Sequence, residues 1–130
     1  MKIKSIIGVT IVTFLFLVSC VQKEHEKTVT FKVNMGQEQN VQNVGLRGQF
    51  TNPSWEVTIP MSDENGDGIF EVTLNEMTAQ NSVTFKFVKN NDEFELQDLP
   101  NRLIRFKYRP EVIIYEGMFD NTNGKQKDIQ

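Results

Sequence analysis

The segment TVTFKV, residues 28–33, decides the fold class, because polar and apolar side chains alternate along it. Alternation with a period of two places Val29, Phe31 and Val33 on one face, as in a strand with one buried side. The same alternation recurs along the chain. It predicts further strands at Val44–Leu46, Trp55–Ile59 (closed by Pro60), Phe70–Leu74 and Val83–Phe87, with shorter apolar runs at Phe94–Leu96, Leu103–Phe106 and Val112–Tyr115.

Turn-forming residue pairs separate these runs at regular intervals. They are Asn52-Pro53, Asn65-Gly66, Asp67-Gly68, Asn90-Asn91 and Pro100-Asn101. Seven to eight short strands within about a hundred residues are typical of an all-β, antiparallel sandwich of the immunoglobulin-like type. We therefore expect one sandwich domain over residues 28–119, followed by a polar, disordered tail over residues 120–130.

The first twenty residues have the organisation of a bacterial export signal. Lys2 and Lys4 precede an apolar run from Ile6 to Val18, which has the length of a signal core and is short for crossing a bilayer. The run leads through Leu17-Val18-Ser19 to Cys20, the only cysteine. This junction resembles the lipobox of bacterial lipoproteins. The alternatives are a plain secretory signal with an incidental cysteine and a short membrane anchor.

The lipobox resemblance implies that residues 1–19 are removed and that lipid is attached to Cys20. We then expect a protein anchored in the cell envelope, at the outer membrane or the cell surface, with the membrane as a partner through that lipid. Residues 20–27 would form the lipidated cysteine and a polar tether, and the folded domain would follow.

The composition after Cys20 argues against several classes of function. Removing residues 1–19 takes away two lysines and no acidic residue, which leaves 12 basic and 17 acidic side chains. This negative balance argues against nucleic acid as a partner. The single histidine, His25, lies in the predicted tether, so a nucleophile–histidine pair is not expected. We expect no enzyme activity, no cofactor and no metal site.

One segment has part of the spacing of a calcium loop. Asp63-Glu64-Asn65-Gly66-Asp67-Gly68 fits the first half of an EF-hand, but the twelfth position is Leu74, where a glutamate is required. A tight turn with glycines at positive φ is the favoured interpretation. A structural calcium ion is the alternative.

Two segments carry a resemblance to a known family: GQFTNPSW at residues 48–55 and VTFKFVKNNDEFELQDLPNR at residues 83–102. Together they resemble the starch-binding modules of carbohydrate-binding families 20 and 48. Those modules have a glycine and a tryptophan, then a Tyr-Lys-Phe strand, then a Trp-Glu…Pro-Asn-Arg segment. The resemblance extends over residues 28–119. It implies a sandwich of the starch-binding-domain type, with α-glucan or a related oligosaccharide as the partner.

The same resemblance implies which residues contact the sugar. Two aromatic platform residues and three polar partners carry over, and they are Trp55, Phe94, Lys86, Glu95 and Asn101. Phe94 stands where the family has tryptophan, and Gln97–Leu99 lengthens the segment before Asn101. Strand phase alone also fits Trp55 and Phe94 as core residues, and the three polar residues as ordinary surface or turn positions.

Two functions of different classes follow. The first is a lipid-anchored, non-catalytic carbohydrate-binding module. The second is an interaction or structural module that keeps the fold, has lost the sugar site and docks onto another protein of the envelope. The replacement at Phe94 favours the second, whereas Trp55, Lys86 and Asn101 favour the first. The polar run at residues 120–125 also looks like the start of a linker, as in a shortened relative of a longer hydrolase.

Overall fold

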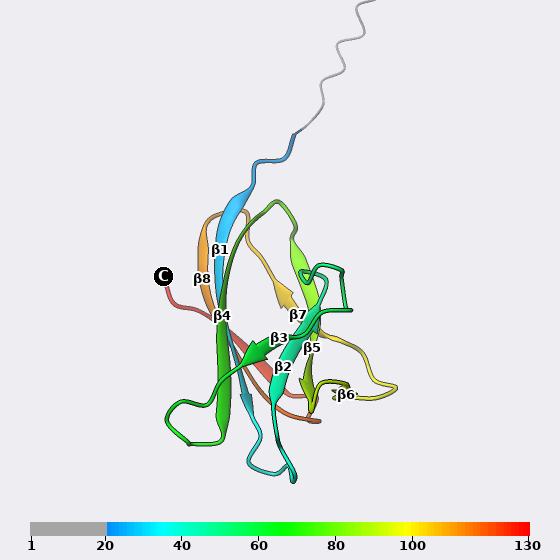
Figure 1. Ribbon diagram of the computed structural model, residues 1–130. Helices are drawn as coiled ribbons and strands as arrows, with labels where there is room; N and C mark the ends of the chain where they lie inside the picture. Colours follow the sequence, from blue (N-terminus) through cyan, green and yellow to red (C-terminus); the bar gives the residue numbers. More distant parts are fainter. Residues whose placement is uncertain (1–20) are drawn as a thin grey trace, which may run out of the picture.

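The structure is a computed structural model that describes residues 21–130. The export signal and Cys20 lie outside the described residues, so both remain predictions. Residues 21–130 form nine strands in two sheets that pack face to face, with no helix (Figure 1). The expected all-β sandwich is therefore confirmed. Over this part of the chain, no helix has the length and apolar character that a membrane crossing needs.

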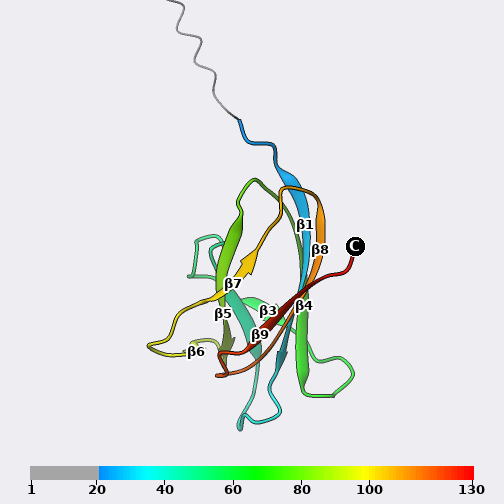
Figure 2. The ribbon, with the colours of Figure 1, turned by 180° about the vertical axis from the view of Figure 1, so that it is seen from behind.

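The two sheets divide the strands unequally. The first, here the β1 sheet, has the order β4 (Ile69–Thr78), β1 (His25–Asn34), β8 (Glu111–Met118), β9 (Gly124–Asp128). The second, the β5 sheet, consists of β3 (Ile59–Met61), β2 (Val44–Gly48) and β5 (Ser82–Lys89), with β6 (Glu93–Phe94) and β7 (Arg102–Arg105) both paired to β5. Figure 2 shows β9 crossing the back of the sandwich.

One strand pair departs from the antiparallel arrangement expected from the sequence. β1 and β8 run parallel, with Phe31 opposite Tyr115, whereas the other strand pairs described are antiparallel. Parallel strands require a long connection between them. Here that connection is the whole of the β5 sheet together with β4, and it brings the two ends of the domain into one sheet.

The core is made by the period-two positions of both sheets. Phe31 of β1 and Phe85 of β5 meet edge to face across the sandwich, with ring centroids 4.9 Å apart. Phe85 also meets Tyr115 of β8 at 4.9 Å. Because each buried side chain of this size contributes about 1.5–3 kcal/mol, these aromatic contacts form a large part of what holds the sheets together.

The third strand lies elsewhere than the sequence predicts. The expected strand Trp55–Ile59 is wrong: Trp55 has a left-handed backbone, with φ 66°, and belongs to the loop before β3. Pro60 does not close a strand but lies inside β3, opposite Gly45. A proline is tolerated there because β3 is an edge strand.

The domain also extends further at both ends than the expected range of 28–119. β1 begins at His25, so the last three residues of the predicted tether belong to a strand. The tail expected to be disordered contains β9, which pairs with β8 from Gly124 opposite Gly117 to Asp128 opposite Ile113. The described residues thus contain both sheets and the core that they share.

The chain enters the sandwich at one end, here called the N-terminal end. Figure 1 shows the start of β1 beside the β4–β5 loop (residues 79–81) and the β7–β8 loop (residues 106–110) at that end. The β1–β2 loop (residues 35–43) and the β3–β4 loop (residues 62–68) lie at the opposite, far end. These loops of the domain therefore gather at two opposite ends of the sandwich.

Candidate functional site

The outer face of the β5 sheet brings two of the predicted site residues together. Lys86 of β5 lies opposite Arg47 of β2, and Phe94 of β6 lies opposite Val88 of β5. Lys86 and Val88 are two residues apart, so they and their partners share one face. The guanidinium of Arg47 lies over the Phe94 ring, 5.1 Å from its centroid, which is a cation–π contact. Both Phe94 and Lys86 are half-buried.

Lys86 holds the loop between β6 and β7. Its Nζ donates to the carbonyl oxygens of Leu96, at 2.8 Å, and Leu99, at 3.2 Å. An ammonium group has three donors, so one is left for a ligand. Lys86 therefore combines a structural task with a position at the surface.

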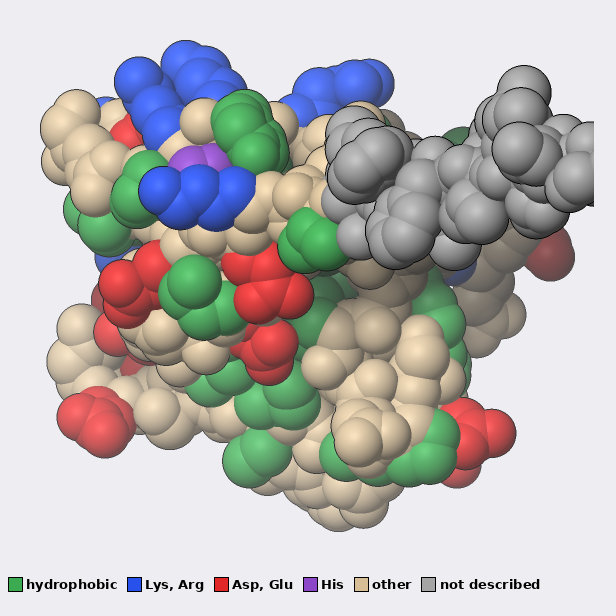
Figure 3. All heavy atoms as spheres, turned by 90° about the horizontal axis from the view of Figure 1, so that it is seen from above, with side chains coloured by type: hydrophobic (Ala, Val, Ile, Leu, Met, Phe, Trp, Pro, Cys, Tyr) green, Lys and Arg blue, Asp and Glu red, His purple; other side chains and the backbone are tan. Residues whose placement is uncertain are grey.

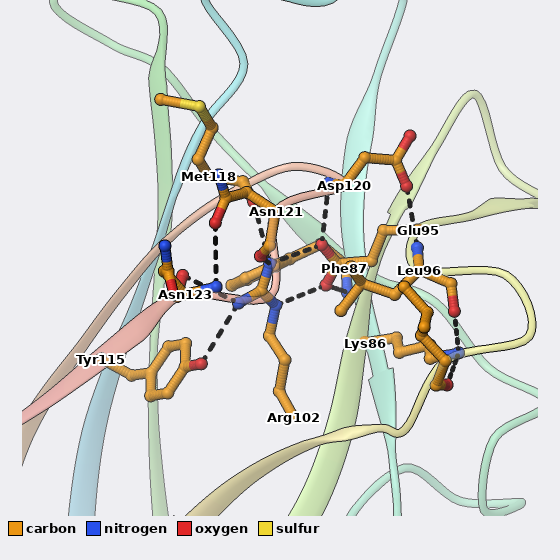
Figure 4. Close-up of polar contacts among 11 residues, drawn as sticks. Lys86, Phe87, Glu95, Leu96, Arg102, Tyr115, Met118, Asp120, Asn121 and Asn123 are labelled. Atoms are coloured by element: carbon orange, nitrogen blue, oxygen red, sulfur yellow. Dashed lines mark hydrogen bonds and ion pairs between the residues drawn. The ribbon is translucent and has the colours of Figure 1, made fainter.

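Glu95 does not take the place predicted for it. Its side chain is fully buried, and its Oε2 accepts from Arg102 Nε at 2.6 Å and from the Phe87 amide at 2.9 Å (Figure 4). A carboxylate with no exposed surface cannot bind a sugar on the outside of the sheet. The prediction that Glu95 contacts the ligand is therefore wrong, and this residue serves the fold.

Arg102 is the partner that the sequence interpretation missed. It donates to Glu95 and also to the carbonyl oxygens of Met118, at 2.8 Å, and Asn121, at 2.7 Å, so it ties β7 to the turn between β8 and β9 (Figure 4). Burial opposes its charge, but the hydrogen bonds and negative charge of Glu95 outweigh burial and raise the pKa of Arg102. The Pro-Asn-Arg motif was the available signal, since it contains this arginine.

Trp55 is held at the surface by its own backbone. Its N–H donates to the Gly48 carbonyl at 3.1 Å and to Thr51 Oγ1 at 2.8 Å, and its side chain is half-buried and outside the core cluster. The alternative that Trp55 is a core residue in phase with a strand does not hold. Gly48 itself lies against β5, where an added Cβ would come within 2.6 Å of the Thr84 carbonyl oxygen.

Arg47 links the loop that carries Trp55 to the Phe94 ring. Its Nε donates to Thr58 Oγ1 at 2.6 Å, near the end of that loop, while its guanidinium covers Phe94. Within residues 21–130, the contacts between aromatic rings lie in the core, at its edge at Phe50, and between His25 and Tyr108. The rings of Trp55 and Phe94 are not in contact with one another. Arg47 was not among the predicted contacts, although its alternation with Leu46 placed it on the outer face.

Asn101 is exposed at the edge of the same face. It directly precedes Arg102, which lies opposite Phe85, so Asn101 follows the line of β7 toward Lys86. The structure thus groups Arg47, Lys86, Phe94 and Asn101 around β5, with the Trp55 loop joined through Arg47.

The Asp63–Gly68 segment is the turn between β3 and β4. The Asp63 carboxylate accepts from the Gly68 amide at 2.9 Å, and the Asp67 carboxylate accepts from the Ile69 amide, also at 2.9 Å. Both glycines have positive φ, at 70° for Gly66 and 82° for Gly68. In the part of the chain that the structure describes, no group of three His, Cys, Asp or Glu side chains is placed to hold a metal ion.

Comparison with known proteins finds no matching family model and no matching curated sequence. Solved structures with a similar course of the chain include two modules of the beta/alpha-amylase from Paenibacillus polymyxa. CBM25-2 is 16% identical with a TM-score of 0.48, over 82% of this chain and 95% of that chain. CBM25-1 is 16% identical with a TM-score of 0.47, over 81% of this chain and 94% of that chain. Similarity at this level concerns the fold and not the ligand.

Proposed function

We propose that the protein is a non-catalytic carbohydrate-binding module whose ligand lies on the outer face of the β5 sheet, with α-glucan as the candidate. The observation that carries this proposal is the half-exposed Phe94 ring beneath the guanidinium of Arg47, with Lys86 opposite Arg47 on the same face. An aromatic ring can cover the apolar face of a sugar, and neighbouring N–H donors can bind its hydroxyl groups.

Trp55 and Asn101 complete the proposed site. Trp55 offers a second half-exposed ring on the loop that Arg47 fastens, and Asn101 offers an exposed amide with both donor and acceptor atoms. If each ring buries roughly 60–100 Å² against a sugar, apolar burial contributes about 1.5–2.5 kcal/mol per ring. After the cost of association, a single site of this kind binds with a Kd of roughly 10 µM to 1 mM.

Affinity electrophoresis tests this proposal directly. Residues 21–130 are run through native gels that contain starch, glycogen or a β-glucan, beside the variants Trp55→Ala and Phe94→Ala. We expect retardation in the α-glucan gels that each of these substitutions reduces. Tyr108→Ala is the matched control, because Tyr108 is exposed on the β7–β8 loop at the N-terminal end, away from Phe94. Unchanged mobility in all three gels would exclude a glucan site.

We also propose that lipid on Cys20 holds this module in the cell envelope, at the outer membrane or the cell surface. The apolar run from Ile6 to Val18 and the Leu17-Val18-Ser19 sequence before Cys20 support this proposal. Cys20→Ser should then shift the protein from the membrane fraction to the soluble fraction. Mass spectrometry of the N-terminal peptide should find acyl chains on the wild-type cysteine.

A second candidate function is docking onto another envelope protein. Lys86 already donates to two carbonyl groups and Glu95 is buried, so two of the five predicted sugar contacts have partners inside the domain. A domain that is folded but not retarded in any gel would favour this function. Cross-linking from Phe94 replaced by a photoreactive aromatic residue would then identify the protein that covers this face.

A further inference from the structure

The charges of the domain are distributed unevenly along the chain. Residues 21–101 carry 6 basic and 13 acidic side chains, whereas residues 102–130 carry 6 basic and 4 acidic ones. The β3–β4 loop, which contains Asp63, Glu64 and Asp67, lies away from the N-terminal end. The N-terminal end displays exposed cations and one exposed aromatic ring beside the exposed carboxylates of Glu24, Glu26 and Glu76. We call the cations and the ring the cationic end: Lys23, Arg105, Lys107, Tyr108 and Arg109.

The cations and the acidic side chains of this end occupy different sides. Glu24, Glu26 and Glu76 lie on or next to β1 and β4, which are paired with one another, whereas Lys107 and Arg109 lie on the β7–β8 loop. Figure 3 looks onto this end and shows positive side chains gathered on one side, near the histidine, with acidic ones beside them. A flat, negatively charged surface would therefore contact this end on the side of the β7–β8 loop, where the cations lie, and not on the side of β1 and β4, where the carboxylates lie.

Buried side chains of β1 and β8 hold the backbone of the β7–β8 loop in place. The buried ammonium of Lys27 donates to the carbonyl oxygens of Lys107, at 2.7 Å, and Arg109, and to Glu111 Oε1, at 2.7 Å. Glu111 Oε1 also accepts from the Lys107 amide at 2.6 Å. Because the backbone is fixed by these bonds, the side chains of Lys107 and Arg109 project from a preformed surface and little ordering is needed when a partner binds.

Tyr108 stands at the tip of this surface. Its ring is 67% exposed and meets the His25 ring edge to face at 4.5 Å, while its hydroxyl accepts from the Lys23 amide at 3.1 Å. Amphipathic aromatic side chains beside cations are characteristic of protein surfaces at the level of lipid headgroups. Arg109 also pairs with Asp128 at 3.1 Å, but an exposed pair of this kind is weak and leaves the guanidinium available.

We propose that the cationic end docks on an anionic phospholipid surface, so that the far end of the sandwich points away from the membrane. This inference rests on the proposed anchor, because only four residues separate Cys20 from β1. Five residue steps reach at most about 18 Å. The anchor thus keeps the domain within a distance of the membrane that is comparable to the Debye length, which is about 8–10 Å in physiological salt. Cations there are attracted to the negative surface potential of the bilayer.

The test uses residues 21–130, which contain both sheets and the core but not Cys20, so a failure of the lipid anchor does not affect it. Co-sedimentation is measured with vesicles of phosphatidylcholine alone or with 40% phosphatidylglycerol, at low and high salt. We expect binding to the phosphatidylglycerol vesicles only, and release by salt. Lys107→Glu combined with Arg109→Glu should weaken the apparent affinity at least about tenfold.

Lys32→Glu combined with Lys125→Glu is the matched control, because it makes the same change in net charge on the outer face of the β1 sheet. Equal weakening in the two double variants would show that net charge alone matters and would overturn the proposal. So would the absence of binding to phosphatidylglycerol vesicles. Retardation in α-glucan gels and membrane fractionation of the Cys20→Ser variant are measured separately, so failure here leaves the proposed function standing.

Discussion

Arg102 and Glu95 form a two-pronged ion pair that is closed off from solvent. Arg102 Nε lies 2.6 Å from Glu95 Oε2, Nη2 lies 2.7 Å from Oε1, and the two side chains are 2% and 0% exposed. Phe94 directly precedes Glu95, and Asn101 directly precedes Arg102. The pair therefore fixes both ends of the loop on which these two candidate contacts lie, although neither charge reaches the ligand.

Glu95→Ala should destabilise the domain strongly. The substitution leaves the Arg102 charge buried without its carboxylate, and breaking a buried pair in this way costs about 3–5 kcal/mol. Urea unfolding of the two proteins gives the difference in the free energy of unfolding. Glu93→Ala is the control, because that carboxylate is exposed and 3.5 Å from Lys89, and we expect a change within about 1 kcal/mol. Similar losses in both variants would contradict the role given to the buried pair.

Phe94→Trp should strengthen oligosaccharide binding. Phe94 is half-exposed on the outer face of the β5 sheet, and an indole adds ring area and an N–H donor. An additional contact of about 1 kcal/mol corresponds to a roughly fivefold lower Kd. Isothermal titration with maltoheptaose measures the change. Tyr108→Trp, at the other end of the domain, should leave the Kd unchanged, and equal effects of the two substitutions would argue against a site at Phe94.

Gly48→Ala should destabilise the domain, although glycine has no special φ there. An added Cβ would meet the Thr84 carbonyl oxygen at 2.6 Å and Phe85 Cβ at 2.9 Å, and neither neighbour is the free end of a side chain. Overpacking of this kind costs about 1–3 kcal/mol. Gly36→Ala is the comparison, because its nearest neighbour is the tip of the Asn34 side chain at 3.0 Å. In thermal unfolding, the Tm of Gly48→Ala should be clearly lower than the Tm of Gly36→Ala.

Because of the β3–β4 turn, the free energy of unfolding should decrease at acidic pH. The Ile69 amide, which donates to the Asp67 carboxylate at 2.9 Å, holds the pKa of Asp67 below its usual value, and the Asp63 and Asn65 side chains add to this effect. A lowered folded pKa means that the stabilisation is complete above the unfolded value of about 3.9 and is lost as the pH falls through the folded pKa. Asp67→Asn should therefore show a shallower loss of stability below about pH 4 than the wild type.

Chemical denaturation at a series of pH values measures this slope. Glu64→Gln, in the same exposed turn, should retain the acid sensitivity of the wild type. If Asp67→Asn loses stability as steeply as the wild type between pH 4 and pH 2, the Asp67 carboxylate does not supply the effect.

The strands with one apolar face were predictable from the sequence. Alternation at Val29–Val33, Val44–Leu46, Phe70–Leu74 and Val83–Phe87 corresponds to β1, β2, β4 and β5, because in each of them one face packs against the other sheet. β9 could not be found in this way. Its residues are polar and exposed on nearly all sides, and it is a strand only because β8 offers its backbone for pairing.

The candidate site was predictable only in part. The alternation of side chains between two faces holds only within a strand, and it stops where the backbone turns. Alternation predicted Phe94 and Leu96 on the same face of one strand, but β6 ends at Phe94, and Leu96 has a φ of 51° and is buried while Phe94 is half-exposed. In the same way, Trp55 alternates with Val57 and Ile59 in the sequence while its left-handed backbone places it in a loop. The burial of Glu95 depends on Arg102, seven residues later, and no local pattern contains that pairing.

β9 forms one edge of the β1 sheet, and Lys125 and Lys127 are both exposed on it. An unpaired edge is a template on which a second chain can add a strand, and lysines on the edge oppose that addition. Copies that crowd together would bring two like-charged edges against each other, and the repulsion keeps their sheets from joining. We therefore expect β9 to oppose edge-to-edge pairing between copies of the domain.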